Sequence, residues 1–398
     1  MKKHSIPLII LLSLTVLIHH VWFFSSGILT HGDFIYEYIE RTKEYVSLPT
    51  LWDSANGFGS LNISTSFWPF LFSIGALTNL SIDPAMANRI VFFWPLAILS
   101  VVSPYCLAYY IFRSRLAAFV SAIVYSCNVT YLTGQTGIIT VSTAISFVPL
   151  FFLFFMLTLE KKKILYALLT ALTGIFMSVY EFRIFYMFFL IAGFYFVYHL
   201  LFIEKAHKFR TTILKPTVLY IIICILIVLL NLYWLAGMAN AGSVLSNEVF
   251  NRGLIGQNFV DIAKTITSFL YLWTGGHFLA FVIQPIPAHF YLIPIIAFAG
   301  LFYAKKNNKV IFFAFVGLLG VFLAKQTGEP FIQVYKWLYD HFPGFNAFRE
   351  STKFYYFIEF SYSILTGAFI MVLFAVSKKK MYNILAYGIT AGIIVLYG

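Results

Sequence analysis

Charged side chains are scarce in this chain, so the few places where acids and bases stand close together are the first candidates for chemistry. Only 11% of the 398 residues are charged. A carboxylate could accept a proton from a reacting hydroxyl, and Arg or Lys could stabilise negative charge that develops on a leaving group. Such residues occur in three stretches: HGDF at 31–34, YEFR at 180–183 and FRESTKFYYFIEF at 348–360.

The first stretch places an acid directly after an apolar run. One face of a predicted helix then carries four acids, spaced four, three and four residues apart: Asp33, Glu37, Glu40 and Glu44. We expect this amphipathic helix to lie on the membrane surface and to end by Pro49, with the three glutamates as its solvated face. Asp33 stands at the junction of two helices, where it could face a substrate. Its alternative role is that of an N-cap.

The second stretch lies between two apolar runs. Glu181 and Arg183 are two residues apart, so they cannot share one face of a continuous helix. They therefore predict a tight break between two helices at the membrane boundary. Charged side chains at such a place raise the free energy of the fold unless they are paired with an opposite charge or hydrated. A binding role and an interhelical salt bridge both fit this pattern.

The third stretch opens a late apolar run. Arg349 and Lys353 are four residues apart and would share one face at the start of a helix. There they would either bind an anion at the membrane boundary, or snorkel to water, or pair with Glu350. Glu359 lies deeper in the same run. We expect a partner to neutralise it and its side chain to line a cavity.

The elements that must position these residues are membrane-spanning helices, since 61% of the chain is hydrophobic. The apolar runs cover approximately residues 5–30, 87–112, 116–133, 139–159, 164–180, 183–203, 216–238, 286–304, 310–324, 353–376 and 382–398. They predict an all-α polytopic membrane protein of about eleven transmembrane helices in a single domain, 1–398. The chain stops at the end of an apolar run, so we expect a further C-terminal region. The three cysteines lie inside apolar runs and are interpreted as packing residues.

The net charge of +12 is explained by topology and does not indicate nucleic acid. Short basic clusters between the apolar runs hold 17 of the 27 Lys and Arg residues, and such clusters collect on the cytoplasmic side of a membrane. This rule places the N-terminus in the cytoplasm and three long segments outside: 31–86, 239–285 and 325–352. Within the second of these, residues 240–285 are interpreted as an external amphipathic or re-entrant segment.

Several of these features together resemble a known family. The chain has an N-terminal helix followed by HGDF, then a Trp- and Gly-containing connection, LWDSANGFGSLNISTSFWPF at 51–70, between two juxtamembrane helices. Further along it has NLYWL at 231–235 and FNAFRESTKF at 345–354. This pattern resembles the glycosyltransferase C (GT-C) fold, and within it the arabinofuranosyltransferase-like membrane proteins. The likeness covers most of the chain as an order of helices and loops, but its motifs are short.

The resemblance implies a glycosyltransferase of the plasma membrane. It would move a sugar from a polyprenyl-phosphate carrier to a glycan, lipid or protein acceptor on the external face, with Asp33 as base or metal ligand. A phosphate leaving group needs cations, which Arg349, Lys353 and Arg183 would supply. Glu181, Glu350 and Glu359 would contact the acceptor or line the cavity. His31 stands beside Asp33, so a divalent cation, Mg²⁺ or Mn²⁺, stays open.

Two other functions compete with transfer. A transporter or flippase of lipid-linked glycans would need discontinuous helices and charges at the bilayer midplane, whereas the charges here gather at the outer ends of the predicted helices. A noncatalytic envelope-assembly protein would keep the fold without the chemistry. The sequence identifies neither the sugar nor the acceptor.

Overall fold

The computed structural model describes most of the chain. It covers residues 2–27, 29, 39–48, 50, 52–53, 60–61, 66–204, 213–245, 253–254, 260–269, 285–376, 388 and 392. Two expected elements lie mostly outside the described residues. They are the last apolar run, at 382–398, and the segment 240–285.

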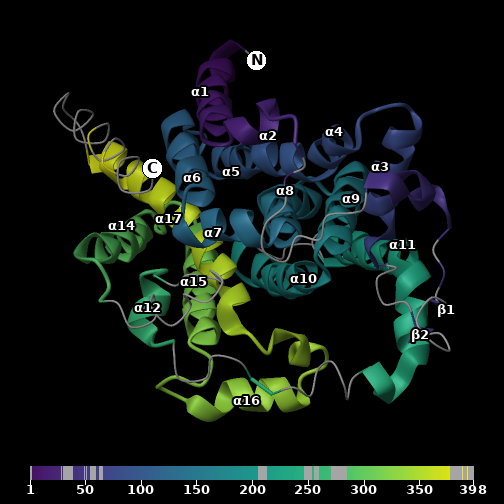
Figure 1. Ribbon diagram of the computed structural model, residues 1–398. Coiled ribbons are helices and arrows are strands. Elements are labelled where there is room, and N and C mark those ends of the chain that lie inside the picture. Colours follow the sequence, from purple (N-terminus) through teal and green to yellow (C-terminus); the bar gives the residue numbers. More distant parts are fainter. Residues whose placement is uncertain are drawn as a thin grey trace.

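The described chain is almost entirely helical (Figure 1). Its first half contains α1 (Lys2–Ile18), α2 (His20–Phe24), η1 (Ile39–Val46), β1 (Trp52–Asp53), β2 (Ser60–Leu61), α3 (Trp68–Asn79), α4 (Pro84–Asn88), η3 (Arg89–Phe93), α5 (Trp94–Phe112), α6 (Arg115–Ser126), α7 (Val129–Gly137), α8 (Ile139–Lys161), α9 (Ile164–Tyr180), α10 (Phe182–Tyr198) and η4 (His199–Ile203). Its second half contains α11 (Lys215–Leu245), α12 (Ile262–Ile266), η7 (Ala288–Tyr291), α14 (Leu292–Ala299), η8 (Gly300–Tyr303), α15 (Lys309–Ala324), α16 (Ile332–His341), η9 (Phe345–Phe348), η10 (Ser351–Phe354) and α17 (Tyr355–Val376).

Several of these helices are long and apolar enough to cross a membrane. Five continuous helical stretches qualify: Pro84–Phe112, Ile139–Lys161, Phe182–Ile203, Lys215–Ala236 and Ser351–Ala375. The pair α6 and α7 adds a sixth if the two form one span bent by 54°. Four shorter apolar helices account for the other expected runs up to residue 376. The structure therefore agrees with an α-helical membrane protein, while the total of eleven crossings stays a prediction.

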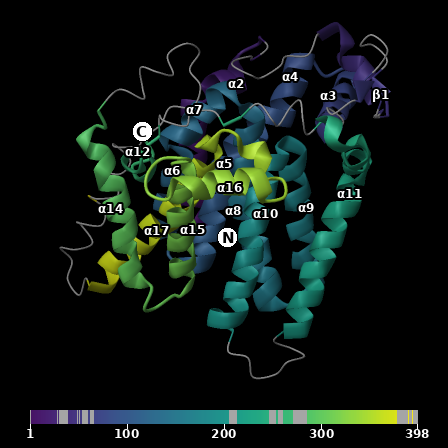
Figure 2. The ribbon, with the colours of Figure 1, turned by 90° about the horizontal axis from the view of Figure 1, so that it is seen from below.

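Polar contacts gather the basic segments at one end of the helix bundle. The Lys309 ammonium lies 2.5 Å from the Glu160 carboxylate, and Lys162 pairs with Glu204. The Tyr198 hydroxyl donates to the carbonyl of Asn308 over 2.9 Å. We call this the basic end. In Figure 2 the helices α9, α10, α11 and α15 run in a similar direction, and α16 runs transverse to that direction.

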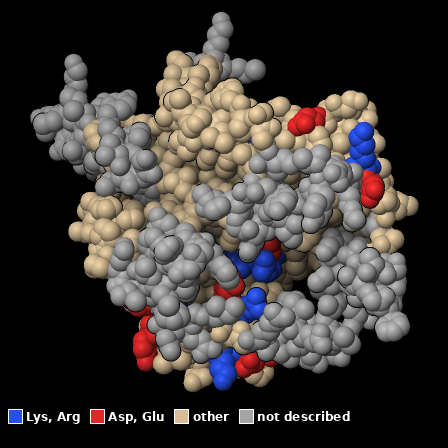
Figure 3. All heavy atoms as spheres, viewed as in Figure 1, with Lys and Arg blue, Asp and Glu red and all other residues tan. Residues whose placement is uncertain are grey.

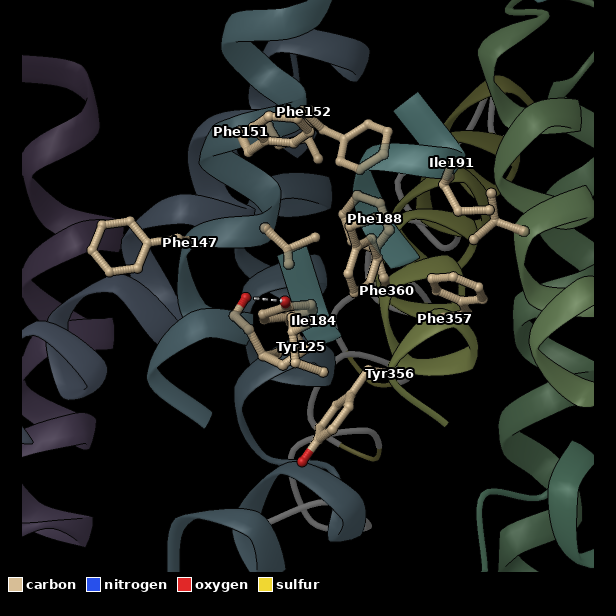
Figure 4. Close-up of a cluster of buried hydrophobic side chains, with 14 of the residues drawn as sticks. Tyr125, Phe147, Phe151, Phe152, Ile184, Phe188, Ile191, Tyr356, Phe357 and Phe360 are labelled. Carbon is tan, nitrogen blue, oxygen red and sulfur yellow. Dashed lines mark hydrogen bonds between the residues drawn. The ribbon is translucent and has the colours of Figure 1, made fainter. Parts of the chain in front are cut away.

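Aromatic side chains fill the centre of the bundle between α8, α10 and α17 (Figure 4). The ring of Phe188 packs edge-on to Phe357 at 5.0 Å, and Phe152 lies 5.0 Å from Phe360. Small residues let α17 approach its neighbours closely, as is common between helices in membranes. A Cβ on Gly320 would meet Phe357 Cβ at 2.8 Å, so a larger side chain would separate α15 from α17.

The described part of the first long loop packs on itself. The short helix η1 lies on α3, and a Cβ on Gly75 would come within 2.9 Å of the carbonyl oxygen of Thr42. The Trp68 indole donates to the carbonyl of Ser47 over 2.8 Å. Helix η1 ends at Val46, in agreement with a helix that stops by Pro49. Glu44 is exposed, as a solvated face requires. Residues 31–38 lie outside the described residues.

Candidate functional site

The break predicted at YEFR is present, and it is built around an ion pair. Helix α9 ends at Tyr180 and α10 begins at Phe182, because Glu181 between them is extended, with φ −156° and ψ 102°. The Glu181 carboxylate caps α10 by accepting from the backbone N–H of Arg183. It also accepts from Arg183 Nε over 2.6 Å and from Nη2 over 3.0 Å. This two-pronged contact fixes the guanidinium plane.

A second ion pair from a distant part of the chain joins the first. The Lys353 ammonium lies 3.3 Å from the Glu350 carboxylate, and both side chains are largely buried. Glu181 interacts electrostatically with Lys353, and Arg183 with Glu350. We call Glu181, Arg183, Glu350 and Lys353 the charged cluster. Figure 3 shows basic and acidic side chains gathered in a hollow of one face of the molecule, over the region of α10 and α17.

Hydrogen bonds hold the late segment against the break. The Tyr335 hydroxyl of α16 donates to the carbonyl of Phe348 over 2.5 Å, and the Tyr186 hydroxyl of α10 donates to that of Pro343. From the end of α15, the Gln326 amide donates to the carbonyl of Arg349 over 2.9 Å. These bonds satisfy backbone groups that would otherwise be unpaired between helices. The charged cluster is therefore held from three sides.

The neighbouring charges of the cluster determine the protonation of Glu181. Burial raises the pKa of Glu181, but the Arg183 guanidinium and the Lys353 charge offset this effect, so the pKa lies below its ordinary value. Glu181 is accordingly an anion at neutral pH and a weak base. Its place is to orient Arg183, rather than to take a proton from an acceptor.

Arg349 does not share a helical face with Lys353 as the spacing predicted. Glu350 between them is extended, with φ −104° and ψ 119°, so η9 and η10 are separate turns. Lys353 turns inward to the charged cluster, whereas Arg349 is partly exposed and acts electrostatically on Tyr339 of α16. Among the residues that the structure describes, Arg349 makes no ion pair. It is the cation at this site that is left for a ligand.

Glu359 is separate from the charged cluster. It lies six residues further along, about 9 Å deeper by helical rise, and is 2% exposed. It lines a small cavity together with residues of α7 and of the segment after α12, and its expected place in a lipid cavity stays a prediction. The expected neutralising partner is not found among the described residues, because both of its carboxylate oxygens are without a hydrogen bond there.

The two residues of the HGDF stretch that were expected to act, Asp33 and His31, lie outside the described residues. The chain just before them is described, and a buried arginine holds it in place. Arg89 is 2% exposed and donates to Ser25 Oγ over 2.7 Å and to the carbonyl of Gly27 over 2.5 Å. Arg89 thus anchors the exit of the first helices, six residues ahead of Asp33. Its position at the opening of an apolar run was a signal that could have identified it.

A metal centre is not indicated by the part of the chain that is described. There, no three His, Cys, Asp or Glu side chains come together in a group that could hold a metal ion. The possible ligands His31 and Asp33 are not among those residues. The arrangement supports anion binding near Arg349 and the charged cluster, with or without a cation.

Comparison of this chain with protein-family models and with curated proteins finds no match. The functional assignment therefore depends on the site itself.

Proposed function

We propose that this chain is a membrane glycosyltransferase that moves a sugar from a polyprenyl-phosphate carrier to a glycan, lipid or protein acceptor. The observation that carries the proposal is the charged cluster: two segments about 170 residues apart meet where a break between helices offers a hollow with cations (Figure 3). The proposal places this end of the bundle on the external face of the plasma membrane and the N-terminus in the cytoplasm.

The cluster suits a leaving phosphate of a lipid-linked donor. Its two acids and two bases balance, so the cluster carries no net charge before the donor binds. Arg349 adds one positive charge at the edge, and the exposed part of Arg183 offers a further donor. As the bond to the sugar breaks, the phosphate gains negative charge, which these guanidinium groups stabilise more strongly than they do the intact donor. Glu181 holds the Arg183 guanidinium in position.

The proton of the acceptor hydroxyl goes to Asp33 in this proposal. Glu181 is a poor candidate because its pKa is lowered and both of its oxygens already accept from Arg183. Glu350 is engaged with Lys353. Arg89 supports Asp33 indirectly, because it anchors Ser25 and Gly27 at the exit of the first helices.

The test is a transfer assay with the full chain in liposomes. Polyprenyl-phosphate sugars are supplied as donors, and the transferred sugar is measured by mass spectrometry. Asp33→Asn should lower the initial rate about 1000-fold, the range expected for loss of a general base, while expression and folding persist. The matched control is Glu44→Gln, which removes an exposed acid of the same loop and should retain full activity. Equal rates for Asp33→Asn and the unaltered chain would reject the assignment.

A second function is favoured by one observation. The 54° bend between α6 and α7 and the buried Glu359 beside it resemble the discontinuous helices and intramembrane acid of transporters. Movement of a lipid-linked glycan between leaflets is therefore the alternative. In liposomes, a fluorescent lipid-linked glycan that changes leaflet without any sugar transfer would favour transport, and transfer without leaflet exchange would favour the enzyme.

A further inference from the structure

The break between α6 and α7 faces a small cavity that no part of the proposed transfer reaction uses. The cavity measures about 70 Å³, which is large enough for an ion with a few waters. It is lined by Cys127, Asn128, Val129, Leu132, Thr267, Ser268, Phe290, Ile293 and Glu359. These residues come from four separate segments, so the cavity is a product of the tertiary fold.

Four oxygen atoms at or beside this cavity have no hydrogen-bond partner among the described residues. Both carboxylate oxygens of Glu359 and the hydroxyl of Ser268 belong to lining residues, and the hydroxyl of Thr130 in α7 acts on Glu359 from outside the lining. Each of the three residues is at least nine-tenths buried. The two hydroxyls lie near enough to act on the carboxylate, but neither reaches hydrogen-bond geometry. Oxygen atoms held near one another and left unpaired inside a protein are typical ligands of a hard cation.

The charge of the surroundings does not compensate Glu359. The titratable groups that interact with it are tyrosines, namely Tyr125, Tyr355, Tyr356 and Tyr362, and these are neutral at physiological pH. Among the described residues, no Lys, Arg or His lines the cavity. A single buried carboxylate in apolar surroundings is costly until one positive charge joins it. A monovalent ion restores neutrality, whereas a divalent ion would leave an excess charge.

Helix ends also favour a cation here. Cys127 is the C-cap of α6 and Thr267 is the C-cap of α12, so two helices direct their negative ends toward the cavity. The partial positive charge at the N-terminus of α7 is partly offset, because the side-chain oxygen of Asn128 accepts from the N–H of Tyr131 over 2.8 Å. The Asn128 amide in turn donates to the carbonyl of Tyr125 over 2.7 Å, which stabilises the break itself.

A second cavity lies beside the site. This larger cavity, of about 360 Å³, lies between α1, α5 and α6, and its polar lining side chains are those of Thr15, His19, Ser100 and Ser126. Cys127 and Leu132 line both cavities, so they form the shared wall.

We propose that the Glu359 carboxylate and the hydroxyls of Ser268 and Thr130 bind one monovalent cation of the size of Na⁺. This site is independent of sugar transfer and of Asp33. Binding of the ion would stabilise the fold, because it joins α17 to α7 and to the segment after α12 and binds only the folded chain.

The test is thermal unfolding of the full chain in nanodiscs. NaCl replaces choline chloride stepwise at constant ionic strength and pH, and Tm is recorded. We expect a saturable rise of roughly 2–5 °C for the unaltered chain. Glu359→Gln should abolish the rise and leave Tm in choline unchanged or higher, because the neutral amide removes the unpaired charge. Glu44→Gln, at an exposed position, should retain the full rise.

Ser268→Ala and Thr130→Val extend the test in case Glu359→Gln does not fold. Each removes one ligand and should raise the Na⁺ concentration at half saturation about tenfold. The proposal is overturned if Na⁺ and choline give the same Tm in the unaltered chain. It is also overturned if Mg²⁺ or Ca²⁺ stabilises where Na⁺ does not, or if Tm follows pH alone, which would mean that Glu359 is simply protonated.

Discussion

The two ends of the helix bundle use charged residues in opposite ways. At the basic end, Lys and Arg exceed the acids, and pairs such as Lys309–Glu160 and Lys162–Glu204 join neighbouring helix ends with partly exposed side chains. At the other end, the charged cluster has equal numbers of acids and bases, and Lys353 and Glu181 are buried. The paired side chains at the first end are all partly exposed, as is typical of basic clusters at a membrane surface. At the second end Glu181, Glu350 and Lys353 are largely removed from water, whereas the side chain of Arg183 stays partly exposed.

This difference indicates where function lies. Desolvating a charge costs several kcal/mol per ion, and a buried ion pair often gives no net stability compared with apolar residues of similar volume. A chain that needed only stability would have little reason to keep four charges in one hollow. The charged cluster is therefore better explained by the ligand that it is prepared to bind.

The largest effect is expected from Lys353→Met. The change removes the ammonium between Glu350 and Glu181 and leaves a buried site with two acids and one base. We expect a loss of about 3 kcal/mol of unfolding free energy, measured as a fall of several degrees in Tm in nanodiscs. If Tm is unchanged, the cluster is more hydrated than its burial suggests.

Arg349→Ala should separate binding from stability. Arg349 is partly exposed and makes no ion pair among the described residues, so its loss should change the unfolding free energy by less than about 0.5 kcal/mol. Sugar transfer should nevertheless fall about 100-fold, because a cation for the leaving phosphate is lost. The matched control is Lys336→Ala, on nearby α16, which should leave the rate unchanged. Equal losses in both variants would indicate a general effect of surface charge.

Glu204→Gln tests the basic end. Glu204 contacts both Lys162 and His199 and is about one-fifth exposed. A partly solvated pair of this kind contributes little, so we expect a loss of at most about 1 kcal/mol and no change in the rate of transfer. A loss as large as that of Lys353→Met would remove the distinction between the two ends.

The sequence predicted the bundle well, because the apolar runs are long and directly visible. The runs expected before residue 377 coincide with described helices or bent helix pairs, and the break at Glu181 follows from the spacing of two charges. The prediction that Arg349 and Lys353 share one helical face was wrong. Glu350 between them is extended, so the two residues belong to separate helical turns. Short-range periodicity does not reveal such a residue between two turns of helix.

The partners of buried polar groups could not be predicted, because they come from distant segments. The cavity at Glu359 is closed by residues near 128, 268 and 290, and no pattern within any one of these stretches marks the others. The same is true of Arg89, whose contacts to Ser25 and Gly27 span more than 60 residues. Packing decides these contacts, and it depends on the whole set of helices.

The smallest expected effect is a fall in Tm at acidic pH. The pKa of Glu181 is lower in the folded chain than its ordinary value of about 4.5, so its ionised form stabilises the fold. That contribution is complete above this ordinary value and is lost as the pH falls through the lower folded pKa. Tm should therefore be insensitive to Glu181 between pH 7 and about pH 5 and should fall in more acidic solution.

Glu181→Gln should flatten this acid decline, because the amide does not titrate, although it starts from a lower Tm at pH 7. Glu44→Gln, at an exposed position of the first loop, should follow the profile of the unaltered chain. The measurement is Tm from pH 7 to pH 3 in nanodiscs of neutral lipid. If Glu181→Gln and the unaltered chain decline in parallel, the Arg183 pair does not hold Glu181 ionised, and the charged cluster would resemble the solvated pairs of the basic end.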